Sequence, residues 1–223
     1  MYMLQQKTRI PYVFLVDSPS PDNIFLGYSI GMALRDSLRA ICIPCFYYMA
    51  TNRQIFDNAL NIQLQSSVSQ MEQQPNINAV PFIHLCMHGA HDGIALTDKS
   101  FVSWNDLRII LKSHNYIKGT DPFICMASCN GINATQMASA FDSAFDIVIC
   151  NQGALLQSDV TVAYLAFYNQ LYHKNASIEQ AVHAMKISSG DVNFYYALGT
   201  KIKNQKFFEL NNQLDINPWG AKF

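Results

Sequence analysis

The sequence predicts an α/β fold in which a mostly parallel central sheet is covered by helices on both faces. Segments typical of strands and of helices alternate from one end of the 223-residue chain to the other. The strand segments are continuous apolar runs, which indicates burial on both faces of the sheet. A chain of this length can enclose one large core, and no internal repeat or composition break divides it. We therefore expect one domain over residues 1–223, with a polar tail at 211–223.

Six apolar runs are the expected strands. Each is rich in β-branched or aromatic residues and is bounded by polar or glycine-containing segments. Pro44 lies inside the second run, where it indicates a sheet edge or a bulge because proline donates no ladder hydrogen bond. The predicted strands are residues 11–18, 40–50, 79–89, 121–127, 145–152 and 194–202.

Amphipathic segments between these runs are the expected helices. The clearest begins after Ser103, a good N-cap residue, and carries Leu107, Ile110 and Leu111 at helical spacing. The glutamine-rich segment 51–74 is expected to form a helix that runs into a solvated linker. The other predicted helices are residues 24–38, 134–143, 158–175 and 177–189.

Composition and charge exclude several classes of function. The chain has 15 basic and 16 acidic residues and a net charge of −1, so no cationic excess is available to hold the phosphates of a nucleic acid. No apolar run reaches the roughly 18 residues of a membrane helix, and the N-terminus does not resemble a signal peptide. The six cysteines lie mostly in apolar runs, which is typical of reduced thiols. We expect a cytoplasmic protein without a membrane or nucleic-acid partner.

Two predicted strands end in residues that are capable of chemistry. The third run ends at His88 and Gly89, and the fourth is followed by the segment 128–131, which contains Cys129. In parallel sheets, functional groups gather beyond the carboxyl ends of the central strands. We therefore expect His88 and Cys129 to face one crevice.

A thiol nucleophile requires neighbours of this kind. An ordinary thiol is mostly protonated at neutral pH, so a nearby imidazole or helix N-terminus is needed to favour the thiolate. Cys129 precedes a predicted helix and His88 can act as the base. The backbone N–H groups of Gly89 and Cys129 could form an oxyanion hole, and Gly131 would permit the tight turn. Such a dyad needs no metal and no organic cofactor.

Other interpretations remain open at this point. A cysteine at a strand end usually packs in the core, and a histidine there often only forms a structural hydrogen bond. Cys42 and Cys45 could join His88 and His91 in a zinc site, but distant strand segments would have to converge, and we favour buried thiols. A flavodoxin-like binder of small molecules is disfavoured, because "DSPSPDN" follows the first strand instead of a glycine-rich phosphate loop.

Several segments together resemble the caspase-like cysteine peptidases, and within them the CHAT-type branch related to separase. The family has a strand ending in His-Gly, followed by a strand ending in a small residue, Cys, any residue and Gly. This chain has "HLCMHG" and then "MASCNG". "DGIALTD" followed by "VSWNDL", the long helical segment 159–185 and the closing "FYYALG" are also similar to the family. The resemblance covers roughly residues 11–202.

The resemblance implies a three-layer sandwich and a thiol protease, a hydrolase that cleaves protein or peptide substrates through His88 and Cys129. It also implies a regulatory protein partner, as many family members have one. In separase-like members an acidic residue in the segment comparable to Asp159 contacts a basic substrate residue, and Asp17 is a second candidate for that pocket. The metacaspase acidic residue two positions before the cysteine is replaced by Ala127, and no arginines match those that caspases use to bind aspartate.

The main alternative from another functional class is a catalytically inactive caspase-like fold that serves as a protein-binding module. Selective labelling of Cys129 by a thiol-reactive peptide electrophile would favour the enzyme.

Overall fold

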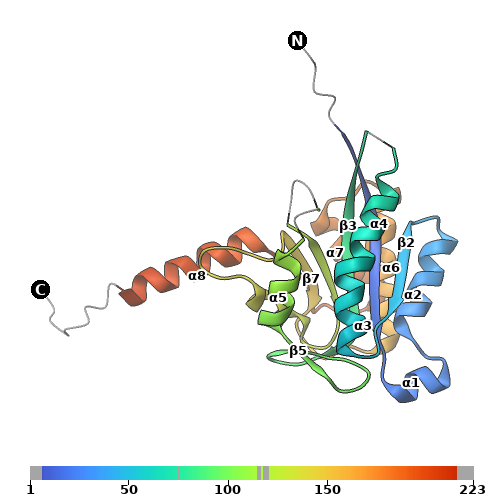
Figure 1. Cartoon of the computed structure of the whole chain (residues 1–223), viewed down its shortest axis with the longest axis horizontal. Helices are drawn as coiled ribbons and strands as arrows, with labels where there is room; N and C mark the ends of the chain where they lie inside the picture. Colours follow the sequence, from blue (N-terminus) through green and yellow to red (C-terminus); the bar gives the residue numbers. More distant parts are fainter. Residues whose placement is uncertain (1–6, 75, 115–116, 118–120, 215–223) are drawn as a thin grey trace, which may run out of the picture.

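A twisted, mostly parallel sheet forms the centre of the computed structural model, which describes residues 7–74, 76–114, 117 and 121–214 (Figure 1). The main strands lie in the order β2-β1-β3-β6-β7-β8. Neighbouring strands are parallel except for β7 and β8, which are antiparallel. The strands are β1 (Thr8–Ser18), β2 (Cys45–Met49), β3 (Ile77–Gly89), β6 (Phe123–Ala127), β7 (Ile147–Asn151) and β8 (Phe194–Leu198).

Two short strands extend the sheet where β3 ends. β4 (Gly93–Ala95) turns back antiparallel to β3, with Ala95 opposite His88, and β5 (Phe101–Ser103) pairs with β4. This small antiparallel extension holds the backbone at the end of β3.

Helices cover both faces of the sheet, so the architecture is an α/β sandwich. On one face lie α2 (Ile30–Ala40), α6 (Gln157–His173) and α7 (Ile178–Ser189). The other face is covered by α3 (Arg53–Asn58), the π-helix η1 (Ala59–Gln63), α4 (Leu64–Met71), α5 (Trp104–Lys112) and the 3-10 helix η2 (Gly131–Met137). α1 (Pro21–Leu26) follows β1, and α8 (Gly199–Leu214) runs away from the sheet (Figure 1). No helix in the described ranges is both long and apolar enough to cross a membrane.

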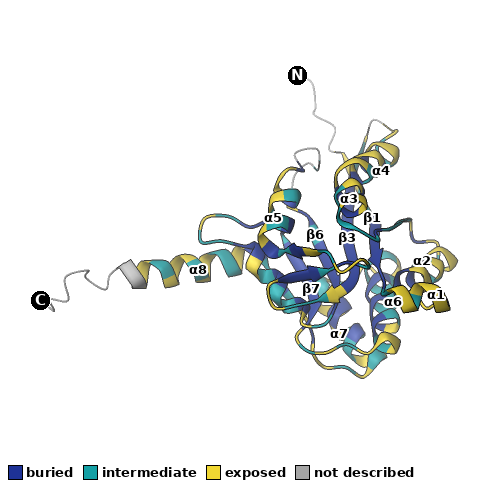
Figure 2. Cartoon of the chain, turned by 60° about the horizontal axis from the view of Figure 1, so that its bottom comes forward, coloured by how far each residue is buried: buried dark blue, intermediate teal, exposed yellow. Residues whose placement is uncertain are grey.

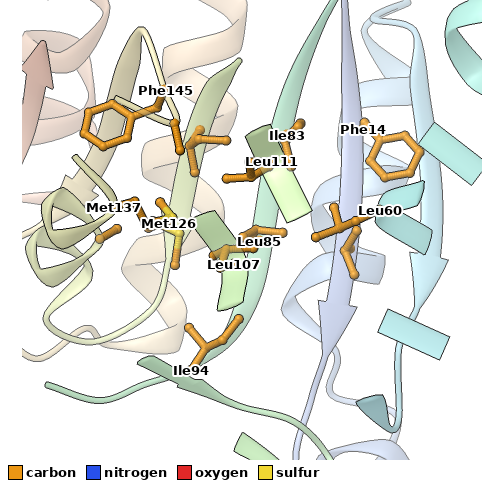
Figure 3. Packing of buried hydrophobic residues seen from close by; sticks show 14 of the residues in the cluster. Phe14, Leu60, Ile83, Leu85, Ile94, Leu107, Leu111, Met126, Met137 and Phe145 are labelled. Atoms are coloured by element: carbon orange, nitrogen blue, oxygen red, sulfur yellow. The ribbon is translucent and has the colours of Figure 1, made fainter. Parts of the chain in front are cut away.

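The two faces of the sheet bury two separate apolar clusters. Successive side chains of a strand point to opposite faces, so Phe14 packs on the α3–α5 side while Leu15 packs on the α6 side. Figure 3 shows the first cluster, in which Leu60, Leu85 and Met126 come from different elements. Full burial of a side chain of this size contributes about 1.5–3 kcal/mol, so both faces of the central strands stabilise the fold.

The predicted helix at 24–38 is two helices in the structure. Gly27 has φ 74° and caps α1 in the left-handed conformation, and the Ser29 hydroxyl then caps α2 by accepting from the Met32 N–H. The sequence prediction was wrong here because the helical spacing of apolar residues continues across this pair of caps.

Boundaries also differ near three other predicted segments. The expected strand 40–50 begins only at Cys45, since α2 extends to Ala40. The helix predicted at 134–143 is instead η2, and an isolated bridge between Ala138 and Ser143 follows it. The last strand ends at Leu198, where α8 begins; residues 211–214 therefore belong to this helix, and 215–223 lie outside the described residues.

Candidate active site

A pocket of about 130 Å³ opens at the edge of the sheet where β1, β3 and β6 end. Because these strands are parallel, their carboxyl ends lie at the same edge. His88 and Cys129 both line this pocket, so the fold brings the two predicted catalytic residues together. Its wall also includes Asp17, Ser18, Asn23, Tyr28, Ser128, Leu155, Gln157 and Val160.

Strand register explains why the histidine and the cysteine lie in the same pocket. Cys86 is opposite Ala127 in the β3–β6 ladder, and His88 and Cys129 each follow two residues later. The two strand ends touch at Gly89, where a Cβ would lie only 2.1 Å from the Cys129 carbonyl oxygen. Gly89 is therefore needed for this close backbone approach.

The turn that presents Cys129 is formed differently from the prediction. Asn130, with φ 50°, adopts the left-handed conformation, which asparagine tolerates better than most residues. Gly131 is not the residue in that conformation. Its role is packing, because a Cβ there would lie 3.0 Å from the Met126 Cβ. The asparagine thus makes the turn and the glycine lets it pack on β6.

The Cys129 thiol is half-buried and has a hydrogen-bond donor beside it. The backbone N–H of Leu155, in the loop after β7, donates to the Cys129 Sγ at 3.4 Å. The Cys129 N–H donates no hydrogen bond to any residue that the structure describes. The sulfur thus accepts a main-chain hydrogen bond, and the Cys129 N–H beside it has no partner among the described residues.

The histidine side of the site is held through the backbone. His88 is exposed, and its ring has no hydrogen-bond partner within the described part of the chain. The turn that follows is fixed at the His91 carbonyl oxygen, which accepts from Trp104 Nε1 at 2.8 Å and from Gln136 Nε2 at 2.9 Å. The backbone around His88 is therefore restrained while its imidazole stays open to solvent.

Asp17 lies in the pocket wall and is almost completely buried, with 1% of its surface exposed. Ser29 and Tyr47 both donate to its Oδ2 atom, the tyrosine at 3.0 Å. Burial raises the pKa of the Asp17 carboxyl, and these two hydrogen bonds oppose the increase. A Cβ at Gly31 would lie 2.5 Å from the Asp17 Cγ, so the start of α2 packs directly on the carboxylate.

Asp159 occupies a different place from Asp17. It is a half-buried residue in the first turn of α6, where the helix dipole favours a carboxylate, and Ser158 Oγ donates to it at 3.0 Å. Asp159 is not among the residues that line the pocket; its helix contributes Gln157 and Val160 instead. Leu156 is the N-cap residue, so Asp159 does not cap the helix.

Sequence reasoning missed several residues around the pocket. Tyr28 and Asn23 line it from the segment around α1, and the Leu155 N–H contacts the thiol. Nothing in the local sequence indicates these roles, because each depends on how a loop folds over the sheet. The left-handed Asn130 did have a signal, since an Asn-Gly dipeptide is typical of turns.

Other titratable residues near the site are enclosed in the core. His84 Nδ1 lies 2.9 Å from the Tyr168 hydroxyl, and burial lowers the pKa of this histidine to about 3. Burial also raises the pKa of the Cys125 thiol to about 12 and that of Cys86 well above its ordinary value. These groups are neutral at physiological pH and help to pack the sheet against α6.

The structure does not bring the four residues of the alternative zinc site together. Cys45 is in register with Val13, which is in register with Phe82. His88 lies six residues beyond Phe82, or about 20 Å further along the strand direction. All six cysteines are unpaired; Cys42 is exposed, contrary to the expectation of burial. Within the described ranges, no group of three or more His, Cys, Asp or Glu side chains is arranged to hold a metal ion.

Comparison with known proteins adds no assignment: no protein-family model matches the chain, and no curated protein is significantly similar to it.

Proposed function

We propose that this protein is a cysteine endopeptidase with a caspase-like fold of the CHAT/separase-like branch, in which Cys129 is the nucleophile and His88 the general base and acid. The observation that carries the proposal is that both residues line one pocket at the ends of adjacent parallel strands. The α/β sandwich agrees with that fold. The substrate would be a protein or peptide, and the expected compartment is the cytoplasm.

The proposed reaction proceeds in two steps. The Cys129 thiol transfers its proton to His88, and the sulfur attacks the carbonyl carbon of the scissile peptide bond. Backbone N–H groups of Cys129 and Gly89 stabilise the oxyanion of the tetrahedral intermediate. His88 then protonates the leaving amine, and a thioester between the substrate and Cys129 remains.

The second step releases the other product. His88 removes a proton from water, the hydroxide attacks the thioester carbonyl, and the thiol leaves with that proton returned through His88. The Leu155 N–H that points at the sulfur would stabilise the thiolate at the start of the first step and at the end of the second.

Asp17 is the residue that we propose to contact a basic side chain of the substrate. Its buried carboxylate lies in the pocket wall, where limited access of water strengthens attraction to a cation. Asp159, the other candidate, has weaker support because it does not line the pocket. A regulatory protein partner is part of the proposal on the resemblance alone.

A cleavage-site profile across a proteome tests the proposed function directly. Wild-type protein is compared with Cys129→Ala, and Cys42→Ala serves as a matched control because Cys42 is exposed and does not line the pocket. We expect new peptide termini with the wild type and the control, enriched after Lys or Arg, and none with Cys129→Ala. Equal sets of termini from all three proteins would refute a peptidase that uses Cys129.

The exposed segment beside the pocket also suits a catalytically inactive binding module. α1 has no buried residue (Figure 2), and its Phe25 is 89% exposed. A peptide electrophile distinguishes this second candidate from the enzyme. Rapid, selective modification of Cys129 supports the peptidase, whereas a Cys129 no more reactive than Cys42 supports the binding module.

A further inference from the structure

The loop between β7 and α6, residues 152–156, is attached to the nucleophile turn at two points. The Leu155 N–H donates to the Cys129 Sγ at 3.4 Å. Two residues earlier, the Gly153 carbonyl oxygen accepts from the Asn130 N–H at 2.8 Å. The position of the sulfur and that of the main chain after it therefore both depend on this loop.

Asn151, the last residue of β7, holds the loop with its side chain. It is completely buried; its Oδ1 accepts from the Gly153 N–H at 2.7 Å, and its Nδ2 donates to Asp191 Oδ2 at 2.7 Å. A backbone N–H can only donate and an ionised carboxylate can only accept, so the two partners determine which way the amide points.

Asp191 is itself held in the turn between α7 and β8. Its Oδ1 accepts from the Asn193 N–H at 2.9 Å, and the Asn193 carbonyl oxygen accepts from the Gln152 N–H at 3.1 Å. A continuous set of hydrogen bonds thus runs from Asp191 through Asn151 and the loop to the Cys129 turn.

We propose that Asn151 is a positioning residue for Cys129, acting through Gly153 and Leu155, and that Asp191 orients its amide. The proposal rests on the proposed function for its catalytic meaning, but its effect on the thiol is measurable without any substrate. The active groups remain Cys129 and His88, and Asn151 sets where the sulfur and its N–H donor lie.

The pH profile of thiol reactivity reports this role. A hydrogen bond from an N–H to sulfur favours the thiolate over the thiol. Loss of the Asn151 contacts releases the loop and withdraws that N–H, so the thiolate should form only at higher pH. A residue that merely stabilises the fold would change the melting temperature and leave this profile in place.

The test is the rate of Cys129 alkylation by iodoacetamide between pH 5 and pH 9, followed by mass spectrometry of the Cys129 peptide. Asn151→Ala is compared with wild type and with Asn193→Ala. Asn193 is a matched control because its side chain makes no hydrogen bond within the described residues, although its backbone belongs to the same turn. Alkylation of the buried Cys125 and Cys150 reports whether each variant is folded.

We expect the profile of Asn151→Ala to move to higher pH and that of Asn193→Ala to coincide with the wild-type profile. A folded Asn151→Ala with the wild-type profile overturns the proposal. If Asn151→Ala does not fold, Asp191→Ala decides. The alanine removes the acceptor of the Asn151 amide and should shift the profile in the same direction, and a folded Asp191→Ala with the wild-type profile overturns the proposal.

Peptide cleavage measured on the same proteins separates the two proposals. A shifted alkylation profile without any cleavage by the wild type supports the positioning role and rejects the peptidase. Cleavage by the wild type with an unshifted profile in Asn151→Ala does the reverse.

Discussion

The two sides of the pocket differ: hydrogen bonds hold one of them, and the other exposes apolar side chains. The nucleophile wall, which we define as the turn 128–131 with the loop 152–156, is held by hydrogen bonds that lead to the buried Asn151. The α1 wall, residues 17–30, carries the exposed helix α1 (Figure 2). Its exposed apolar side chains include Phe25 at 89% and Tyr28 at 64% exposure. The first wall is suited to hold a reactive atom in place. The second has an apolar surface at the pocket that a substrate chain can cover.

The largest effect is expected on the nucleophile wall. Cys129→Ala removes the proposed nucleophile, so cleavage of a peptide substrate should fall by at least about 10⁴-fold. Cys42→Ala should keep wild-type activity, because this exposed thiol lies outside the pocket. Turnover of a fluorogenic peptide measures both variants, and residual cleavage by Cys129→Ala above one tenth of the wild-type rate would show that another group is the nucleophile.

A histidine buried in β3 makes stability depend on pH. Burial lowers the pKa of His84 to about 3, whereas an unfolded chain takes up this proton near pH 6.5. The unfolded state therefore binds more protons as pH falls from about 6.5 toward 3. His84 should therefore lower the free energy of unfolding by about 1.4 kcal/mol for each unit by which the pH falls across that window. Above pH 6.5 it causes no such loss.

Urea unfolding of wild type and His84→Gln at pH 7 and pH 5 measures this contribution. Other titrating groups, including His114, are the same in both proteins, so the difference between the two pH slopes isolates His84. We expect the wild type to lose about 2 kcal/mol more than the variant between these pH values. Parallel slopes would mean that His84 is not neutral in the folded protein.

Gly89→Ala tests the contact between the strand ends. The new Cβ would lie 2.1 Å from the Cys129 carbonyl oxygen, so one strand end must move. A displacement of about 1 Å at a reacting group costs about 10²-fold in rate, and we expect kcat/KM to fall by that amount. The matched control is Gly153→Ala, which keeps the N–H and the carbonyl oxygen that hold its loop and whose Cβ would lie 3.7 Å from the nearest atom. Wild-type rates for Gly89→Ala would show that this close approach is not required.

The hydrogen bonds that Asp17 accepts lead us to expect a preference for Lys over Arg in the substrate. Ser29 and Tyr47 both donate to Oδ2, which leaves Oδ1 as the carboxylate oxygen without a partner among the described residues. A lysine ammonium needs one such oxygen, whereas a guanidinium binds best through two. We therefore expect peptides with Lys before the scissile bond to be cleaved faster than those with Arg, and both faster than apolar ones.

Two variants separate the parts of this prediction. Asp17→Asn should reduce the preference for Lys over an apolar residue by about tenfold, in proportion to the loss of one charge–charge contact. Tyr47→Phe frees one position on Oδ2 and should raise cleavage after Arg relative to Lys. Matched Lys, Arg and norleucine peptides give the ratios, and unchanged ratios in Asp17→Asn would remove Asp17 from substrate binding.

The smallest effect is expected on the α1 wall. Tyr28→Ser should reduce kcat/KM for a protein substrate by a few-fold, because Tyr28 lines the pocket and an exposed ring that covers the substrate contributes about 1 kcal/mol. Stability should change little, since the side chain is 64% exposed. Phe141→Ser, on an exposed loop whose Phe141 does not line the pocket, is the control. An equal effect of both variants would argue against substrate contact at α1.

The amino-acid pattern was sufficient to predict the sheet and the functional residues at the ends of two of its strands. Continuous apolar runs predicted β1, β3, β6 and β7 because strands buried on both faces need apolar side chains at every position. Since such strands are parallel, the positions of His88 and Cys129 at two carboxyl ends were enough to predict that they share a crevice.

The surroundings of those two residues became clear from the packing of the loops and helices around them. The sequence could not show that Asp17 lines the pocket while Asp159 does not, because the direction of each side chain depends on the path of α2 and α6 over the sheet. Nor could it reveal Asn151 or the Leu155 N–H as neighbours of the nucleophile turn. Hydrogen bonds between segments that are distant in the chain leave no periodic pattern, so they become visible only when the loops are packed together.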